Sequence, residues 1–137
     1  MCKLGDIIVV SEFKNEVGEI ISKHSFVVVS DKKDIIEGLN YDFVSNMLCS
    51  FHDEKHKNRK LKYKENMEIK RKYIIGDKLN NKDSYVKADQ LYFFNKKLIK
   101  YKVIANLSDY YLNKLLELIS NLKYEGKVKL ISTNLKE

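Results

Sequence analysis

The stretch SYVKADQLYFFNKKLIKYKVIANL, residues 84–107, carries two runs typical of β-strands on either side of a short polar link. Residues 84–94 and 98–107 are rich in β-branched and aromatic side chains, which favour strands. The link, Asn95-Lys96-Lys97, has the length of a hairpin turn. We therefore expect the two runs to pair as an antiparallel hairpin.

The residues that follow this stretch predict the longest helix of the chain. Ser108 is suited to the N-cap position, and Asp109 lies where the positive end of the helix dipole favours an acidic side chain. Gly126 is a fitting terminator. Apolar side chains recur every three or four residues and predict one buried stripe: Tyr111, Leu112, Leu115, Leu116, Ile119 and Leu122.

Further strands are predicted on both sides of this region. Four segments carry the strand pattern: residues 5–10, 24–30, 41–50 and 127–132. Residues 67–69 favour one more strand or part of an extended arm. Residues 11–23 are polar and contain Gly18, which predicts a long connecting loop, a type of segment that often forms a lid.

Short polar segments complete this pattern. Residues 31–33 and 80–83 predict turns, and residues 34–39 predict a short helical or irregular piece. Strands dominate, and one clear helix comes late in the chain. We therefore expect an α+β fold, with a curled antiparallel sheet or small barrel and a C-terminal amphipathic helix against it.

Length and composition favour a single domain over residues 1–137. The chain is 44% hydrophobic and 33% charged, which is too apolar for a disordered basic tail. No apolar run approaches the roughly 20 residues that cross a bilayer, and the first residues lack the pattern of a signal peptide. We therefore expect a cytoplasmic protein that contacts no membrane, with Cys2 and Cys49 reduced.

The basic charge is concentrated in one segment, CSFHDEKHKNRKLKYKENMEIKRK, residues 49–72. Residues 55–72 hold nine basic and two acidic residues, a balance of +7 that equals the net charge of the whole chain. Such a patch suits a polyanion. Tyr63, Tyr73 and Tyr85, on or near it, are candidates for stacking on unpaired bases. The alternative is a solvated lysine-rich loop that only keeps the protein soluble.

The chain has three histidines, His24, His52 and His56. With an ordinary pKa near 6.5, histidine serves as acid or base at neutral pH. Two histidines four residues apart on a helix can also bind zinc, but that signature has glutamate directly after the first histidine, and here the residue is Asp53. No third ligand is evident nearby, so we expect no metal and no cofactor.

Several motifs resemble the MazF/PemK family of toxins. The order is Gly5-Asp6-Ile7-Ile8, a loop with a glycine, and then a polar pair and valine run, His-Ser-Phe-Val-Val-Val-Ser, at residues 24–30. The far half is similar in its glutamine-containing strand at residues 86–94, its second strand at 99–104 and its leucine-rich helix opened by Leu107-Ser108. Residues 50–57, SFHDEKHK, also resemble the serine, lysine and Lys-His signature of ToxN/AbiQ endoribonucleases.

This resemblance implies a small SH3-like barrel that forms a homodimer. It also implies metal-independent cleavage of single-stranded RNA such as mRNA, by attack of the 2′-OH, in a toxin that is paired with a protein or RNA antitoxin. The family's Arg-Pro pair falls on His24-Ser25. Its Thr or Ser at the end of the next strand falls on Ser50, or on Cys49 if the register slips by one.

These inferences define the expected site. Metal-independent cleavage needs a base for the 2′-OH, an acid for the 5′-oxygen and donors for the charge of the transition state. We assign these roles to His24, Ser50, His52 and Lys55. RNA binding is assigned to His56, Lys57, Arg59, Lys60, Lys62 and Lys64. Two alternatives remain: a non-catalytic nucleic-acid-binding module with the same barrel, and a protein-interaction domain with an incidental lysine run.

Overall fold

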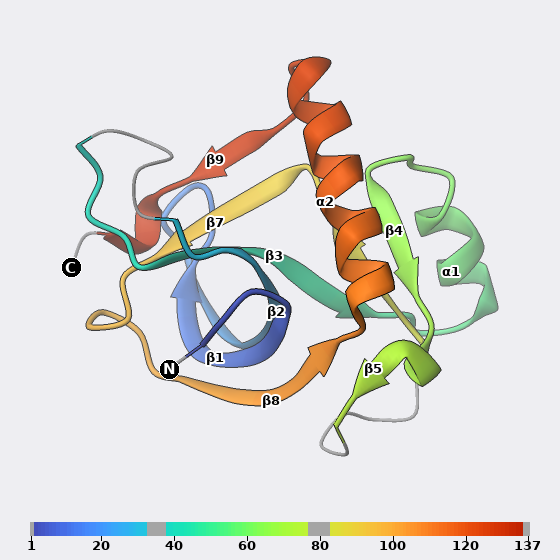
Figure 1. Ribbon diagram of the computed structural model, residues 1–137, viewed down its shortest axis with the longest axis horizontal. Coiled ribbons are helices and arrows are strands. Elements are labelled where there is room, and N and C mark those ends of the chain that lie inside the picture. The colour runs from blue at the N-terminus through green and yellow to red at the C-terminus, as the bar shows by residue number, and fades with distance from the viewer. Residues whose placement is uncertain (1, 33–37, 77–82, 136–137) are drawn as a thin grey trace.

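The structure is a computed structural model that describes residues 2–32, 38–76 and 83–135. It is an α+β fold, with an open and mostly antiparallel sheet accompanied by two α-helices (Figure 1). The strands are β1 (Asp6–Lys14), β2 (Ile20–Ser30), β3 (Phe43–Ser50), β4 (Asn66–Ile69), β5 (Ile74–Ile75), β6 (Ser84–Lys87), β7 (Gln90–Phe94), β8 (Tyr101–Leu107) and β9 (Lys129–Ile131). The α-helices are α1 (Glu54–Lys60) and α2 (Asp109–Tyr124), and 3-10 turns occupy Arg71–Tyr73 and Thr133–Leu135.

The strand order is β4-β6-β3-β2-β1-β8-β5, and β7 pairs with both β3 and β9. All pairs are antiparallel except β7 with β9. The predicted strands at residues 5–10, 24–30, 41–50, 67–69 and 127–132 are therefore confirmed as parts of one sheet. The piece predicted at 34–39 and the turn predicted at 80–83 lie largely outside the described residues, and the turn predicted at 31–33 is described only for residues 31 and 32.

The long loop predicted for residues 11–23 is wrong. β1 continues to Lys14, and β2 begins at Ile20, directly opposite Lys14. The turn between them is closed by Asn15, whose Oδ1 accepts hydrogen bonds from the backbone amides of Val17 (3.1 Å) and Glu19 (2.9 Å). Strands with one exposed face carry polar side chains on that face, and these residues made the hairpin resemble a loop in the sequence.

The hairpin predicted within residues 84–107 is also wrong. β7 pairs with β3 on one edge, where Phe43 lies opposite Phe94, and with β9 on the other edge. Both edges of β7 are thus occupied, and β8 pairs instead with β1 and β5. The turn predicted at Asn95-Lys96-Lys97 does form, with the Leu98 amide donating to the Asn95 carbonyl (2.9 Å), but the strands on its two sides do not pair with each other. The Lys96 amide donates to Asp42 Oδ2 (2.8 Å) ahead of β3.

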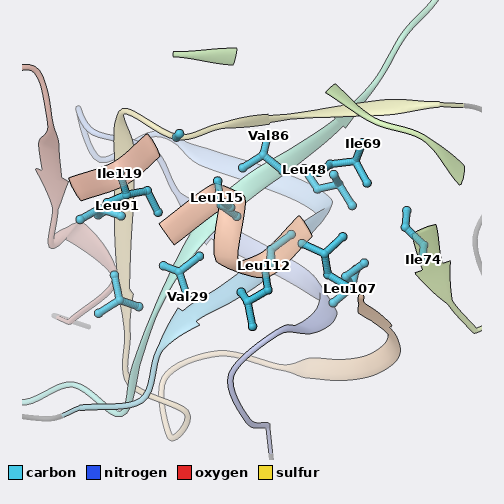
Figure 2. Close-up of a cluster of buried hydrophobic side chains, with 14 of the residues drawn as sticks. Val29, Leu48, Ile69, Ile74, Val86, Leu91, Leu107, Leu112, Leu115 and Ile119 are labelled. Atoms are coloured by element: carbon cyan, nitrogen blue, oxygen red, sulfur yellow. The ribbon is translucent and has the colours of Figure 1, made fainter. Parts of the chain in front are cut away.

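Apolar side chains from α2 and one face of the sheet form the larger core cluster. Figure 2 shows Leu112, Leu115 and Ile119 of α2 lying in the same cluster as Leu91 and Val86. Leu115 is fully buried, and burial of such a side chain is worth about 2 kcal/mol. Four residues of the stripe predicted for this helix are therefore confirmed as core, Leu112, Leu115, Ile119 and Leu122, and the other two, Tyr111 and Leu116, pack against it partly buried.

A second cluster lies on the opposite face of the strands, because successive side chains along a strand alternate. Phe26, Tyr92 and Phe94 belong to it, whereas Phe93 belongs to the cluster under α2. All three rings of Tyr92-Phe93-Phe94 are buried within one chain. They therefore provide no surface for a second subunit.

The ends of α2 agree in part with the prediction. Ser108 occupies the N-cap position, but its Oγ is buried and has no hydrogen-bond partner among the described residues. The Ser108 amide donates instead to the carbonyl oxygen of Tyr73 (3.0 Å). At the other end Gly126 has a φ of 71°, and the Lys127 amide donates to the Leu122 carbonyl (2.9 Å), which closes the helix.

The sequence did not predict α1, which begins after Asp53. The carboxylate of Asp53 accepts a hydrogen bond from the His56 amide (2.7 Å) and caps the helix. Helix α1 covers the start of the basic segment, where an extended arm was expected. Neither described helix is long and apolar enough to traverse a lipid bilayer.

Candidate active site

The first half of the site is built by the register between β2 and β3. Ser25 lies opposite Leu48 in this ladder, so His24 and Cys49 face each other one step further along. His24 Nε2 is 3.6 Å from Cys49 Sγ. The His24 ring also contacts Phe13 and Phe26 edge to face, with ring centroids 6.2 Å apart in each case. These contacts hold the imidazole at the strand surface.

The second half is built by α1 and the residue before its cap. The His52 amide donates to His56 Nδ1 (3.1 Å), and the two rings lie with centroids 4.4 Å apart. Because His56 Nδ1 accepts this hydrogen bond, the neutral ring carries its proton on Nε2. The capping bond from the His56 amide to Asp53 fixes the same turn.

Two stacked aromatic rings connect the two halves of the site. Phe51 and Tyr85 are buried and stack with centroids 5.0 Å apart. Tyr85 lies opposite Cys49 in the pairing of β3 with β6, and its ring contacts that of His56 edge to face. This pair joins the end of β3 to α1.

The two halves enclose an open cavity of about 550 Å³. Its lining residues come from β2, β3, α1 and β6: Lys23, His24, Ser25, Leu48, Cys49, Ser50, His52, His56, Arg59, Lys60 and Tyr85. All three histidines of the chain therefore line one cavity. Lys23, Arg59 and Lys60 make its surroundings positive.

Burial sets the protonation state of the groups at the β2–β3 side. It lowers the pKa of His24 from the ordinary 6.5, and the positive charge of Lys87 lowers this pKa further. Burial raises the pKa of the Cys49 thiol. Burial, together with Cys49, also raises the pKa of Tyr85 to about 12. At neutral pH the side chains of Tyr85, Cys49 and His24 are therefore uncharged.

The pKa of His56 is lowered as well. Desolvation is the main cause, followed by the positive surroundings of His52, Arg59 and Lys60. A histidine with a lowered pKa is neutral at pH 7 and is able to accept a proton. The cavity thus holds at least two neutral imidazoles beside cationic side chains.

The predicted site residues divide into two groups. His24, Ser50, His52, His56, Arg59 and Lys60 all line the cavity. Lys55 and Lys62 are exposed and lie outside the set of described residues that line it. Lys57 forms an ion pair with Glu68 (2.9 Å) and Lys64 forms one with Glu125 (2.6 Å). The charge expected from Lys55 is supplied at the cavity by Arg59 and Lys60.

The register also decides which residue contacts His24. Sequence reasoning placed Ser50 beside His24, with Cys49 as the alternative if the register slipped by one. The contact is made by Cys49, and Ser50 lines the same cavity at the exposed end of β3. Sequence reasoning did not assign Lys23 or Lys87 to the site. The position of Lys23 directly before His24 in the sequence was the available signal.

No group of three or more His, Cys, Asp or Glu side chains within residues 2–32, 38–76 and 83–135 is placed to hold a metal ion. His52 and His56 do contact each other, but they do so through the hydrogen bond to Nδ1 of His56 and the close approach of their rings.

A comparison of the sequence with protein-family models and with curated proteins finds no match.

Proposed function

We propose that the protein is a metal-independent endoribonuclease, the toxin of a toxin–antitoxin pair, with a MazF/PemK-like domain of SH3-like barrel type. The observation that carries this proposal is the convergence of His24, His52 and His56 in one open, positively charged cavity. Cleavage of RNA without a metal needs an acid, a base and cationic or hydrogen-bonding donors. This cavity contains all of these groups.

In the proposed reaction the 2′-oxygen of a ribose attacks the adjacent phosphorus. The O2′–P bond forms, the P–O5′ bond breaks, and the products are a 2′,3′-cyclic phosphate and a 5′-hydroxyl. Neutral His24 accepts the 2′ proton, and His52 donates a proton to the leaving 5′-oxygen. Arg59 and Lys60 neutralise the charge that develops on the phosphoryl oxygens, with Ser50 and His56 Nε2–H as hydrogen-bond donors.

The substrate class follows from the shape and charge of the site. An open cavity beside exposed lysines suits a flexible single strand, whose bases and phosphates are accessible. The resemblance to the toxin family favours messenger RNA as this single strand, and we place the activity in the cytoplasm. The resemblance to the toxin family supports two further parts of the proposal, a homodimer and a protein or RNA antitoxin that binds the toxin.

Incubation of the pure protein with a long RNA in EDTA, followed by mapping of the new ends, tests the proposal. We expect discrete cuts that carry 5′-hydroxyl and 2′,3′-cyclic phosphate ends. Retarded migration without cleavage would overturn the enzymatic proposal in favour of a non-catalytic nucleic-acid-binding module. Neither cleavage nor retardation would leave the protein-interaction domain as the explanation.

The proposed assembly has its own test, sedimentation velocity at micromolar concentration. We expect a homodimer. A monomer at every accessible concentration would contradict the proposed homodimer, without affecting the chemistry assigned to a cavity that one chain builds by itself.

A further inference from the structure

Three tyrosines and two lysines lie together outside the cavity, and we call them the tyrosine–lysine surface: Lys72, Tyr73, Tyr110, Tyr111 and Lys114. The two lysines and Tyr110 are exposed, whereas Tyr73 and Tyr111 are half-buried. The rings of Tyr73 and Tyr111 lie 4.4 Å apart between centroids, and Tyr110 contacts Tyr111 at 5.6 Å. Tyr110 is 62% exposed. Tyr110 therefore presents its ring to solvent, next to the half-buried rings of Tyr111 and Tyr73.

Both lysines of this surface lie over aromatic rings. Lys114 Nζ is 5.0 Å from the ring centroid of Tyr110 and 5.9 Å from that of Tyr111. Lys72 Nζ is 5.1 Å from the centroid of Tyr73. Two ammonium groups therefore accompany three rings. The acidic residue next to the cluster in the sequence is Asp109, which is exposed in the first turn of α2.

The backbone holds this surface in place. The Ser108 amide donates to the Tyr73 carbonyl (3.0 Å) and joins the 3-10 turn to the start of α2. The next residue after the turn, Ile74, pairs with Leu107 in the sheet. Figure 1 shows β5 and the start of α2 close together at the edge of the molecule. The backbone that carries the three tyrosines is therefore joined across the two elements within one chain.

We propose that the tyrosine–lysine surface is a second contact for single-stranded RNA, which holds unpaired bases of the substrate outside the cavity. Bases stack on aromatic side chains whatever their sequence, and nearby cations bind the phosphates. The basic segment contributes to both places: Arg59 and Lys60 line the cavity, and Lys72 lies directly before Tyr73 in the sequence. The identity of the strand as RNA rests on the proposed function.

Fluorescence anisotropy with a short, labelled 2′-O-methyl RNA tests this inference, because the probe has no free 2′-OH and cannot be cut. The matched variants are Tyr110→Ser and Tyr124→Ser, two exposed tyrosines at opposite ends of α2. We expect Tyr110→Ser to weaken binding of the single strand about fivefold or more, the scale of one lost stacking contact. Tyr124→Ser should bind the single strand with the affinity of the wild type. Neither variant should change the affinity for duplex RNA.

A second pair of variants tests the role of the cations. Lys114→Gln should reduce the slope of log K against log salt by about 0.7, the value for one lost phosphate contact on a single strand. Lys123→Gln, in the last turn of the same helix, is the control. Equal affinity and equal slope for all four variants, with unchanged thermal melting, would overturn the inference even if the wild-type protein cuts RNA.

Binding without cleavage would support the second contact and contradict the enzymatic proposal. If the wild-type protein binds the single strand through Tyr110 but leaves natural RNA uncut, the second contact stands and the enzymatic proposal fails. If the wild-type protein binds no single strand at all, both fail.

Discussion

At the scale of the residue, the contact between His24 and Cys49 carries the most information. Burial lowers the pKa of the imidazole and raises that of the thiol, so neither group is charged at neutral pH. A neutral thiol 3.6 Å from Nε2 restricts the rotation of the ring. Cys49 is therefore a positioning residue in the proposed reaction, which acts through His24.

We expect Cys49→Ala to lower kcat about tenfold and to leave KM nearly unchanged, because general acid–base catalysis depends on the position of the base. Cys49→Ser, which keeps a hydrogen-bonding group, should restore most of the rate. Cys2→Ser is the control, since this thiol lies outside the cavity lining. Steady-state kinetics measures the three variants. A rise in KM with unchanged kcat for Cys49→Ala would instead assign Cys49 to RNA binding.

The sequence indicated histidines and basic residues as site candidates because both are conspicuous in it, and the structure places the three histidines, Arg59 and Lys60 around one cavity. It could not predict which lysines are available. Lys57 and Lys64 are paired with Glu68 and Glu125, and the second of these partners is 61 residues away. Pairing across such a separation is set by the tertiary fold, and local charge counting does not detect it.

At the scale of the element, α1 is short and depends on its cap. It has seven residues, none of them buried, and it presents His56, Arg59 and Lys60 to the cavity. Helices this short are marginal by themselves. The Asp53 cap is therefore expected to matter more for the site than for the stability of the whole protein.

Asp53→Ala should destabilise α1 by about 1 kcal/mol, the usual cost of removing an N-cap. We expect kcat/KM to fall several-fold as the helix frays, while the midpoint of thermal unfolding changes little because α1 contributes no buried side chain. Asp53→Asn keeps a capping oxygen and is the matched control. Circular dichroism melting and RNA cleavage, measured on the same samples, test this prediction. Equal loss of activity in both variants would show that the charge of Asp53, and not its cap, is what matters.

Among the elements, individual strands were predictable and their pairing was not. The runs that became β7 and β8 have strong strand composition, but each pairs with strands that lie far away in sequence. The β1–β2 hairpin was missed because its strand composition is weak where the two strands meet the turn. There, the end of β1 and the start of β2 carry polar side chains on the exposed face. Pairing depends on which edges the rest of the sheet leaves open.

At the scale of the whole molecule, the sequence indicated an α+β fold because one periodic helix follows many short strands. The sequence did not indicate how the charged side chains are arranged in space, which the fold determines. Arg59 and Lys60 line the cavity, whereas Lys57 and Lys64 neutralise acidic side chains. The nine basic residues of the segment should therefore contribute unequally to RNA binding.

We expect the double variant Arg59→Gln, Lys60→Gln to flatten the salt dependence of RNA binding by about 1.4 in the slope of log K against log salt, at roughly 0.7 per lost phosphate contact. The double variant Lys57→Gln, Lys64→Gln removes the same charge and should change the slope much less. Anisotropy titrations over a range of salt concentrations measure both. An equal decrease of the slope in both double variants would mean that RNA binding depends on the total charge of the protein and not on the cations that line the cavity.

The most direct test of the central claim is the single-turnover cleavage rate of His24→Ala, measured with saturating protein over a range of pH. We predict a rate about 10²-fold below wild type at pH 7, the scale of one positioned acid–base group, with RNA affinity nearly intact because Arg59 and Lys60 are unchanged. The wild-type rate should fall as the pH drops through the lowered pKa of His24, below its ordinary 6.5, since the base then becomes protonated. A folded His24→Ala variant that cuts RNA at the wild-type rate would contradict the assignment of His24 as the base.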